Sequence, residues 1–201
     1  MINPKDWLEF GQKFHGHKCP AMPMGLRVGA AAMNALGVER AKDGQLIALV
    51  DLGDDHCATC YADGLQVILG ATFGKGNIRK NPLGKLGFTL IEKDSNRAVR
   101  VVFTSKLQKQ IAASNFMQQR AAGISPDEIP PEDQMELVEL VWNAKEEEVL
   151  KIGEVFEYPG KWIPEVMGFK PCDRCGELTA LAYLRVDGTQ HVCIPCSGYD
   201  R

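Results

Sequence analysis

The sequence predicts an α+β protein with an antiparallel or mixed sheet, packed helices and a small C-terminal zinc-finger module. Three observations support this class. Short apolar runs of strand length alternate with segments of helical periodicity through residues 1–160. Prolines and glycines then break every regular pattern between residues 157 and 170. Two Cys-x2-Cys pairs follow in residues 170–201. We therefore expect an α+β core domain over residues 1–160 and a four-cysteine zinc finger over residues 170–201.

The composition is that of an ordinary globular protein. Charged residues make up 24% and hydrophobic residues 45% of the 201 positions, and the formal net charge is −3. No long basic tract is present, so nucleic acid is not favoured as a partner. The first residues lack the apolar core of a secretory signal and no segment reaches transmembrane length, so we expect a cytoplasmic protein without membrane contacts. In that compartment cysteines serve as ligands or catalysts more often than in disulfides.

Residues 14–20 carry the first candidate site, with the sequence Phe-His-Gly-His-Lys-Cys-Pro. Alternate side chains of an extended chain point the same way, so His15, His17 and Cys19 would face one spot. Pro20 favours this arrangement because the residue before a proline avoids the helical region. Two imidazoles and a thiol suit zinc or another transition metal. The alternative is a chance grouping in a loop.

The next two elements are a helix and a strand. Pro23 can open a helix at its first turn, apolar residues then recur at helical spacing, and Gly37 can end the helix after Leu36. Its many glycines and alanines imply close packing against another element. The apolar run Leu46–Leu52 has the length of a buried strand.

A second candidate site follows that strand. Cys57 and Cys60 lie at or just before the N-terminus of a predicted helix through Leu69, where the helix dipole favours thiolates. Asp63 and Gln66 follow Cys60 at steps of three and would share its helix face. The alternative is an ordinary helix cap with buried cysteines.

A glycine-rich loop occupies residues 70–77. Its spacing differs from that of a nucleotide-binding phosphate loop, so a triphosphate site is not expected. Lys75 and the backbone amides could still hold a small anion, together with Asn77. A plain tight turn explains the loop equally well.

The rest of the core contributes a hairpin and helices. Residues 88–91 and 98–103 are predicted strands joined by a turn at residues 94–96. Residues 106–122 are expected to be helical, and residues 132–150 form the most strongly helical stretch.

The C-terminal module has the layout of a structural zinc site. Seventeen residues separate the pair Cys172 and Cys175 from the pair Cys193 and Cys196, as in many four-cysteine zinc sites. The module has little apolar material, so zinc would supply much of its folding energy. We expect a hairpin between the two pairs, and the module could also dock a protein partner.

Four ordered motifs carry a family resemblance: Phe14–Pro20, Gly25–Gly29, Cys60–Gln66 and Gly74–Asn77. Together they resemble the FmdE-like family of formylmethanofuran dehydrogenase proteins across roughly residues 10–80. The resemblance implies a prokaryotic protein with an α+β core, usually a homodimer, and some members carry a C-terminal treble-clef-like zinc finger. The family takes its name from an operon for a molybdenum or tungsten enzyme of methanogenesis, so a link to one-carbon metabolism is implied. The small-residue helix and the helix after residue 132 also offer packing surface for a homodimer.

Two departures from the family pattern bear on the site. Ala21 stands where the family commonly has glycine, and Ala71 stands where it often has cysteine. The resemblance therefore leaves the site to four ligands, with Cys57 as a substitute thiol. The four are His15, His17, Cys19 and Cys60.

The sequence is consistent with three functions. The first is a metal-dependent enzyme or accessory subunit whose core zinc or other transition metal is bound by His17, Cys19 and Cys60. His15 or Cys57 would be a further ligand or acid–base group, and Asp63 would orient a ligand. A small anionic substrate or cofactor would be contacted by Arg27, Gln66, Lys75 and Asn77. The second function is metal delivery or regulation, with docking through the zinc finger. The third is dithiol redox chemistry at the Cys57-x2-Cys60 pair.

Overall fold

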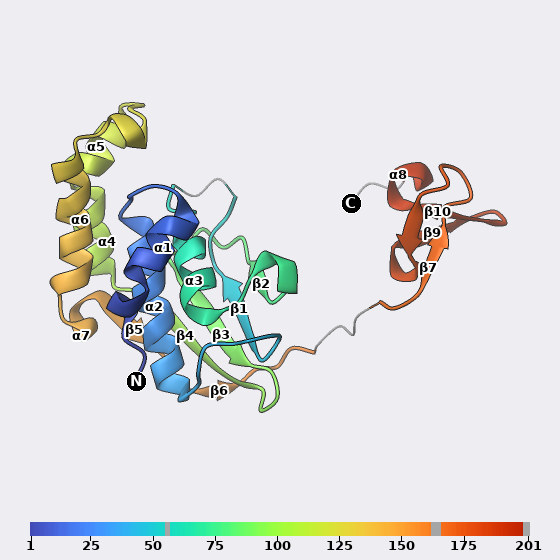
Figure 1. Ribbon diagram of the computed structural model, residues 1–201, viewed down its shortest axis with the longest axis horizontal. Coiled ribbons are helices and arrows are strands. Elements are labelled where there is room, and N and C mark those ends of the chain that lie inside the picture. Colours follow the sequence, from blue (N-terminus) through green and yellow to red (C-terminus); the bar gives the residue numbers. More distant parts are fainter. Residues whose placement is uncertain (55–56, 162–165, 199–201) are drawn as a thin grey trace. The chain divides into compact units, whose positions relative to one another are not determined.

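The computed structural model describes residues 1–54, 57–161 and 166–198. The chain divides into two compact units, Met1–Tyr158 and Pro159–Arg201 (Figure 1). Among the described residues, none of the helices has both the length and the apolar character needed to cross a membrane.

The core unit is built on a mixed sheet with the strand order β2-β1-β3-β4-β5, and β6 pairs with a second part of β4. Only the β1–β2 pair is parallel among the described strands. The strands are β1 (Leu46–Val50), β2 (Ile78–Lys80), β3 (Gly87–Glu92), β4 (Arg97–Phe103), β5 (Leu150–Ile152) and β6 (Phe156–Glu157). The predicted hairpin forms between β3 and β4, and its turn contains Asn96 with a positive φ of 58°. The α+β class with a mixed sheet is thus confirmed.

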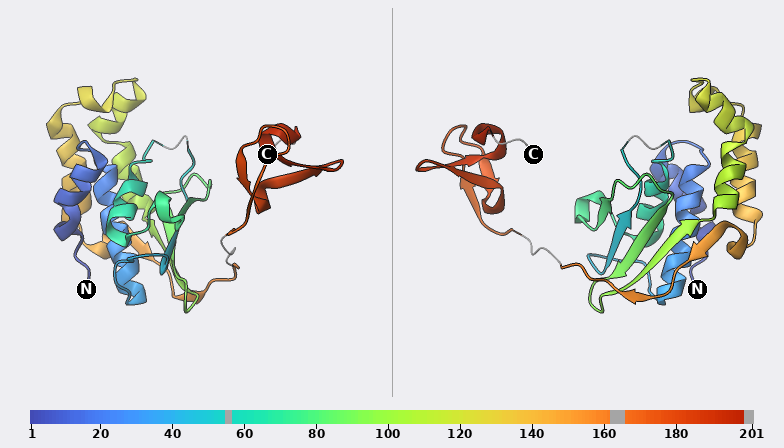
Figure 2. Two further views of the ribbon diagram at one scale, coloured as in Figure 1. Left: turned by 45° about the vertical axis from the view of Figure 1, so that its right-hand side comes forward. Right: turned by 180° about the vertical axis from the view of Figure 1, so that it is seen from behind.

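Helices cover one face of this sheet and extend beyond it (Figure 2). The helix α2 is buried along most of its length and packs against α3 and β4. The helices are α1 (Leu8–His15), α2 (Ala21–Leu36), α3 (Tyr61–Leu69), α4 (Ser105–Ala112), α5 (Asn115–Ala121), α6 (Pro131–Asn143) and α7 (Glu146–Val149). Short 3₁₀ turns are η1 (Pro4–Trp7), η2 (Phe73–Lys75) and η3 (Pro126–Glu128). The small residues of α2 are therefore used within the chain, against α3, and do not form the free surface expected for a subunit contact.

Two predicted helices are each divided. The stretch 106–122 breaks at Ser114, whose side chain accepts a hydrogen bond from the Met117 amide and so caps α5. The stretch 132–150 ends as α6 at Asn143, continues as the short α7, and becomes extended at Leu150, which pairs with Phe103 of β4. The sheet edge supplies backbone partners that a continued helix would not use. Both stretches are thus largely helical, as expected, but each is divided into two helices.

The C-terminal unit consists of two small hairpins and a short helix. Its elements are β7 (Phe169–Pro171), β8 (Leu178–Ala180), η4 (Leu181–Tyr183), β9 (Leu184–Asp187), β10 (Gln190–Cys193) and α8 (Ile194–Ser197). Its buried cluster holds Cys172, Val192 and Cys193, with Cys196 packed against it. Three of these four residues are cysteines, so the unit has almost no apolar core apart from its thiols.

Candidate metal centres

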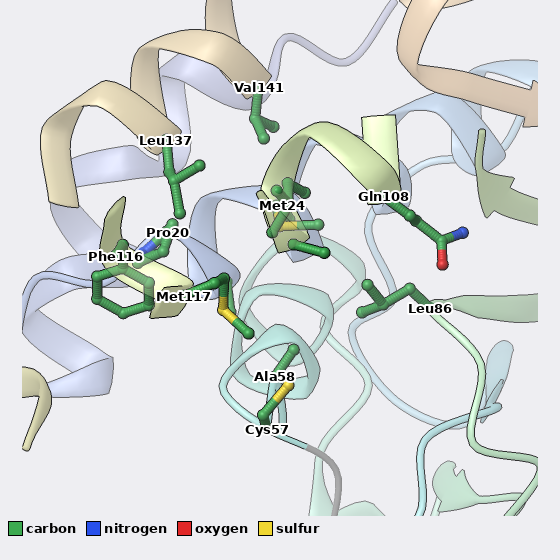
Figure 3. A pocket seen from close by; sticks show the side chains of 13 residues that line it. Pro20, Met24, Cys57, Ala58, Leu86, Gln108, Phe116, Met117, Leu137 and Val141 are labelled. Carbon is green, nitrogen blue, oxygen red and sulfur yellow. The ribbon is translucent and has the colours of Figure 1, made fainter. Parts of the chain in front are cut away.

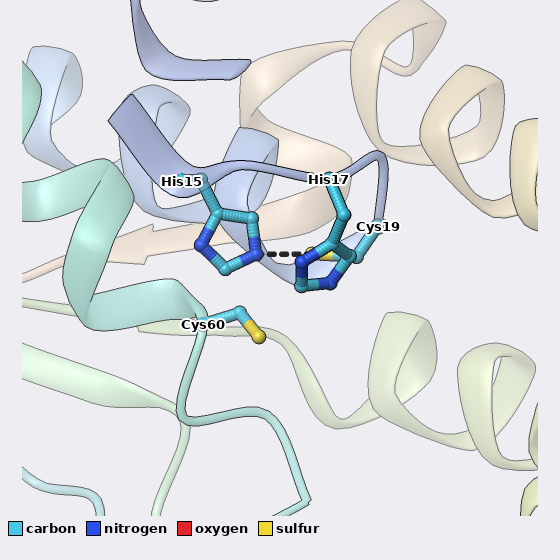
Figure 4. A group of neighbouring side chains, drawn as sticks. All are labelled: His15, His17, Cys19 and Cys60. Atoms are coloured by element: carbon cyan, nitrogen blue, oxygen red, sulfur yellow. Dashed lines mark hydrogen bonds between the residues drawn. The ribbon is translucent and has the colours of Figure 1, made fainter. Parts of the chain in front are cut away.

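The core unit groups four potential metal ligands, two histidines and two cysteines (Figure 4). They are His15, His17, Cys19 and Cys60. Their ligand atoms all lie within 4.8 Å of one another. Three come from the segment around the end of α1, and Cys60 comes from the start of α3. Residues about forty positions apart in sequence thus form one group.

The segment that carries the two histidines is not extended, contrary to our prediction. His15 is the last residue of α1, and Gly16 follows with a left-handed φ of 90° and donates its amide to the Gln12 carbonyl. A glycine adopts this conformation without steric cost, so the chain reverses here. The reversal puts the rings of His15 and His17 at a centroid distance of 4.2 Å and brings Cys19 Sγ to 3.4 Å from His15 Nε2.

Both core thiols lie at the N-terminal ends of helices. Cys19 precedes α2 and accepts hydrogen bonds from the amides of Ala21 and Met22, and Cys60 is the N-cap residue of α3. A hydrogen bond from Cys60 is the largest cause that lowers the pKa of Cys19, to about 7, against the opposing effect of burial. The same hydrogen bond and burial raise the pKa of Cys60. Of this pair, Cys19 is the thiol that ionises first as the pH rises in the metal-free protein.

Two glycines explain why these helix ends meet. A Cβ on Gly25 of α2 would overlap the carbonyl oxygen of Tyr61, and a Cβ on Gly64 of α3 would overlap that of Met22. The two helices therefore pack backbone to backbone within two turns of Cys19 and Cys60. The small residues of α2 predicted this packing. Gly64 was not predicted to take part, although a glycine inside a helix costs about 1 kcal/mol relative to alanine and so indicates a packing role.

A chain of hydrogen bonds leads from His15 to the glycine-rich loop. His15 Nδ1 donates to Asp63 Oδ2 over 2.7 Å, which leaves Nε2 facing Cys19. Gln66 Nε2 donates to Asp63 Oδ1, and the Phe73 amide donates to Gln66 Oε1. A carboxylate on the far nitrogen fixes the tautomer and orientation of a metal-binding imidazole. Asp63 thus lies where it can orient a ligand, and Gln66 holds Asp63.

The donor set and its spacing suit a four-coordinate metal ion. Zinc–sulfur bonds of about 2.3 Å and zinc–nitrogen bonds of about 2.0 Å place tetrahedral ligand atoms roughly 3.5 Å apart. The 3.4 Å between Cys19 Sγ and His15 Nε2 agrees with this spacing. The core group could therefore hold a metal without a large rearrangement.

The C-terminal unit contains a second group, made only of thiols. The ligand atoms of its four cysteines lie within 4.8 Å of one another, and Cys175 Sγ is 3.8 Å from Cys193 Sγ. Backbone amides of Cys175 and Cys193 donate to Cys172 and lower the pKa of that thiol to about 6. Such amide–thiolate bonds favour the charged form that metals bind. The four are Cys172, Cys175, Cys193 and Cys196.

Comparison with known proteins assigns the core unit to a family. A family model described as "FmdE, Molybdenum formylmethanofuran dehydrogenase operon" matches residues 14–151. The chain belongs to the FmdE family. An Archaeoglobus fulgidus protein described as "Probable S-adenosyl-L-methionine-binding protein" is 30% identical over 198 residues, which cover 93% of this chain and 51% of that protein. This FmdE chain therefore spans about half the length of that relative.

A solved structure shares the fold of this FmdE protein. The crystal structure of a "tungsten formylmethanofuran dehydrogenase subunit e (fmde)-like protein" from Syntrophus aciditrophicus matches with a TM-score of 0.63 at 19% identity. The match covers 98% of this chain and 93% of that chain. The resemblance stated from the four sequence motifs is thus confirmed.

Several residues expected at the FmdE site lie elsewhere or are already used. Cys57 is exposed and is not part of the core ligand group, while residues 55 and 56 before it lie outside the described residues. Cys57 lines an apolar cavity beside Pro20 (Figure 3). Of the two cysteines described in the turn before α3, Cys60 lies with the histidines and Cys57 does not, so the structure does not support Cys57 as a ligand of this group.

The side chains expected to contact a substrate make contacts within the chain. The guanidinium of Arg27 is buried and donates to the carbonyls of Val141 and Ala144 at the end of α6. Lys75 Nζ donates to the Gly70 carbonyl over 2.8 Å. The side chain of Asn77 is 4% exposed and bonds three backbone groups, those of Thr72, Asp43 and Leu46. These contacts hold the glycine-rich loop in a tight turn. The side chain of Asn77 is occupied by them and is not free to bind an anion.

Proposed function

We propose that the core unit is a metal-dependent catalytic unit that activates a small molecule at a zinc or another transition metal. The observation that carries this proposal is the unequal burial of the four ligands. Cys19 is 8% exposed and the His15 side chain 5% exposed, whereas His17 is exposed to solvent. Catalytic zinc sites keep three protein ligands and one exchangeable position. His17 is the ligand that a substrate or water would replace.

The residues around the metal have distinct roles in this proposal. Cys19 and Cys60 supply negative charge, and Asp63 holds His15 in the orientation that a ligand needs. A metal held there would act as a Lewis acid or lower the pKa of a bound water. The FmdE family supports a role, as enzyme or accessory subunit, in formylmethanofuran-type one-carbon metabolism. The reduced thiols suit the cytoplasm, and the family habit supports a homodimer, which light scattering would test.

Metal analysis of matched variants tests the proposal. His17→Ala should keep the core metal and open a position, whereas Cys60→Ala should lose the metal. The histidine control is His191→Ala, because His191 lies in the C-terminal unit and is not one of the grouped ligands. Imidazole added to the cobalt(II)-loaded His17→Ala protein should change the visible spectrum. Equal metal loss in His17→Ala and Cys60→Ala would contradict the proposal, since it would make the site a closed one.

A second candidate function is metal delivery, with the C-terminal zinc finger docking the recipient. The exposed His17 supports this as well, because a transferable metal also needs one accessible side. Adding imidazole or a small chelator to the metal-loaded protein separates the two functions. If added imidazole binds while the metal stays, the site is catalytic, and if the metal leaves with small chelators within seconds, the site serves delivery. Dithiol redox chemistry at the Cys57-x2-Cys60 pair has less support, because Cys60 belongs to the group with Cys19 and the two histidines and Cys57 does not.

A further inference from the structure

An apolar cavity of about 180 Å³ lies in the core unit, between the start of α2, the turn before α3, and the helices α4, α5 and α6 (Figure 3). The wall includes Met24, Phe116, Met117, Leu137 and Val141. The metal proposal does not use these side chains.

The chemistry of the wall selects an uncharged occupant. None of the described lining residues carries a charge, and the polar side chains are those of Gln108 and Cys57. The Gln108 amide already donates to the Phe103 carbonyl over 2.8 Å. A charged group entering this cavity would lose its hydration without gaining a partner, which strongly disfavours its binding. The occupant is therefore apolar over the part that enters.

The volume limits the size of this part. An apolar cavity of about 150 Å³ holds one benzene molecule in another protein, so about 180 Å³ accepts a single substituted ring. The wall can adapt to such a ring, because methionine side chains are flexible and their sulfur makes favourable contacts with aromatic groups. Met24 and Met117 lie on opposite elements, α2 and α5.

The cavity adjoins the peptide segments that carry the two core thiols. Pro20 and Ala21 line it and directly follow Cys19, and Ala58 lines it two residues before Cys60. The cavity thus borders the backbone next to Cys19 and close to Cys60.

We propose that this cavity binds the apolar, single-ring-sized part of an uncharged small molecule whose other end reaches the core metal centre. The contact with the metal rests on the proposed function, whereas binding to the cavity does not. The proposal replaces the small anionic substrate expected from Lys75 and Asn77, whose polar groups are engaged in the glycine-rich loop.

Methionine-methyl NMR with toluene as the probe tests the binding. Toluene should shift the methyl signals of Met24 and Met117 in a saturable manner and leave Met167, in the other unit, unchanged. Benzoate, a charged molecule of similar size, should shift neither. Met117→Trp should fill the cavity and abolish the toluene response of Met24, while the matched control Met167→Trp should keep it. An absent response of Met24, or an equal response to benzoate, would overturn the proposal.

A second experiment, with cobalt(II) in the core group, distinguishes this proposal from the proposed function. With cobalt(II) in the core group, the protons of bound toluene should relax several-fold faster than with zinc. Toluene binding without this effect, in protein shown to hold cobalt(II), would overturn the position beside the metal. Toluene binding in a protein that takes up no core metal would support the cavity and overturn the metal function. Core metal binding without toluene binding would support the metal function and overturn the cavity proposal.

Discussion

The Cys19 thiol is the most strongly activated titratable group of the core site. Its pKa of about 7 arises chiefly from the hydrogen bond with Cys60, and the amides of Met22 and Ala21 add to the effect. The ordinary pKa of a cysteine thiol, which applies to the unfolded chain, is 9.0. Folding therefore lowers the pKa of Cys19. A lowered thiol pKa stabilises the folded state fully above the unfolded pKa, and this contribution is lost as the pH falls through the folded pKa.

We therefore predict that the free energy of unfolding of the metal-free protein rises between pH 7 and pH 9 because of Cys19. Thiolate absorbance should show one core thiol half-ionised near pH 7. Cys60→Ala should move this ionisation to higher pH, because it removes the largest stabilising hydrogen bond. An unchanged titration in Cys60→Ala would contradict the assigned cause.

Asp63 acts on the site through His15 rather than as a ligand. We predict that Asp63→Asn lowers the metal affinity of the core group by about 10–100-fold, the usual loss when the partner of a metal-binding histidine is changed. Competition with a chelator measures this affinity. Asp94→Asn, an exposed change in the β3–β4 turn, is the control and should leave the affinity unchanged.

At the scale of elements, the contact between α2 and α3 sets the position of both thiols. We predict that Gly64→Ala destabilises the core by on the order of 3 kcal/mol, the upper end for overpacking, because the added methyl overlaps the Met22 carbonyl. Core metal affinity should fall as well, since the helix ends move apart. Gly44→Ala is the matched control, because a Cβ there would meet no described atom within 4 Å. Denaturant unfolding that gives equal stabilities for the two variants would refute the spacer role.

The sequence predicted the main elements but not where neighbours interrupt them. Helical spacing predicts a helix over residues 23–36, and the observed helix α2 spans Ala21–Leu36. The apolar run 46–52 contains β1. The strand β2 was not predicted, because Ile78–Lys80 is short and mostly polar and is extended through its parallel pairing with β1. Pairing partners distant in the chain leave no local pattern.

The residues of the candidate site were predicted better than their arrangement in space. Ligand chemistry pointed to the two histidines and Cys19, the family resemblance added Cys60, and the structure brings the four together. The reason given, an extended chain, was wrong, since Gly16 ends a helix instead. Cys57 lies outside the ligand group and Asn77 binds backbone groups because of the way their turns are oriented. That orientation is a tertiary property that residue spacing does not encode.

At the scale of the whole molecule, each of the two units carries its own group of four potential metal ligands. We predict that Cys175→Ser unfolds the unit Pro159–Arg201 and removes one metal per chain, because thiols make up most of that unit's buried cluster. The core unit should keep its fold and its metal. Limited proteolysis with elemental analysis measures both effects, and Thr179→Ala, a surface change in the same unit, should produce neither. Full metal content in Cys175→Ser would contradict the prediction.

The left-handed turn at Gly16 has a consequence for the lifetime of the protein. Of the eight described residues of α1, only Gly11 is buried, so α1 has little hydrophobic attachment of its own. His15 at its end adds a polar attachment to the core, through Asp63 and through any ion held with Cys19 and Cys60. Loss of such an ion would loosen the end of α1 and the loop that leads to Cys19, and proteases attack loosened segments first. Metal starvation would then appear as faster turnover of the whole chain, so its abundance would report the supply of metal.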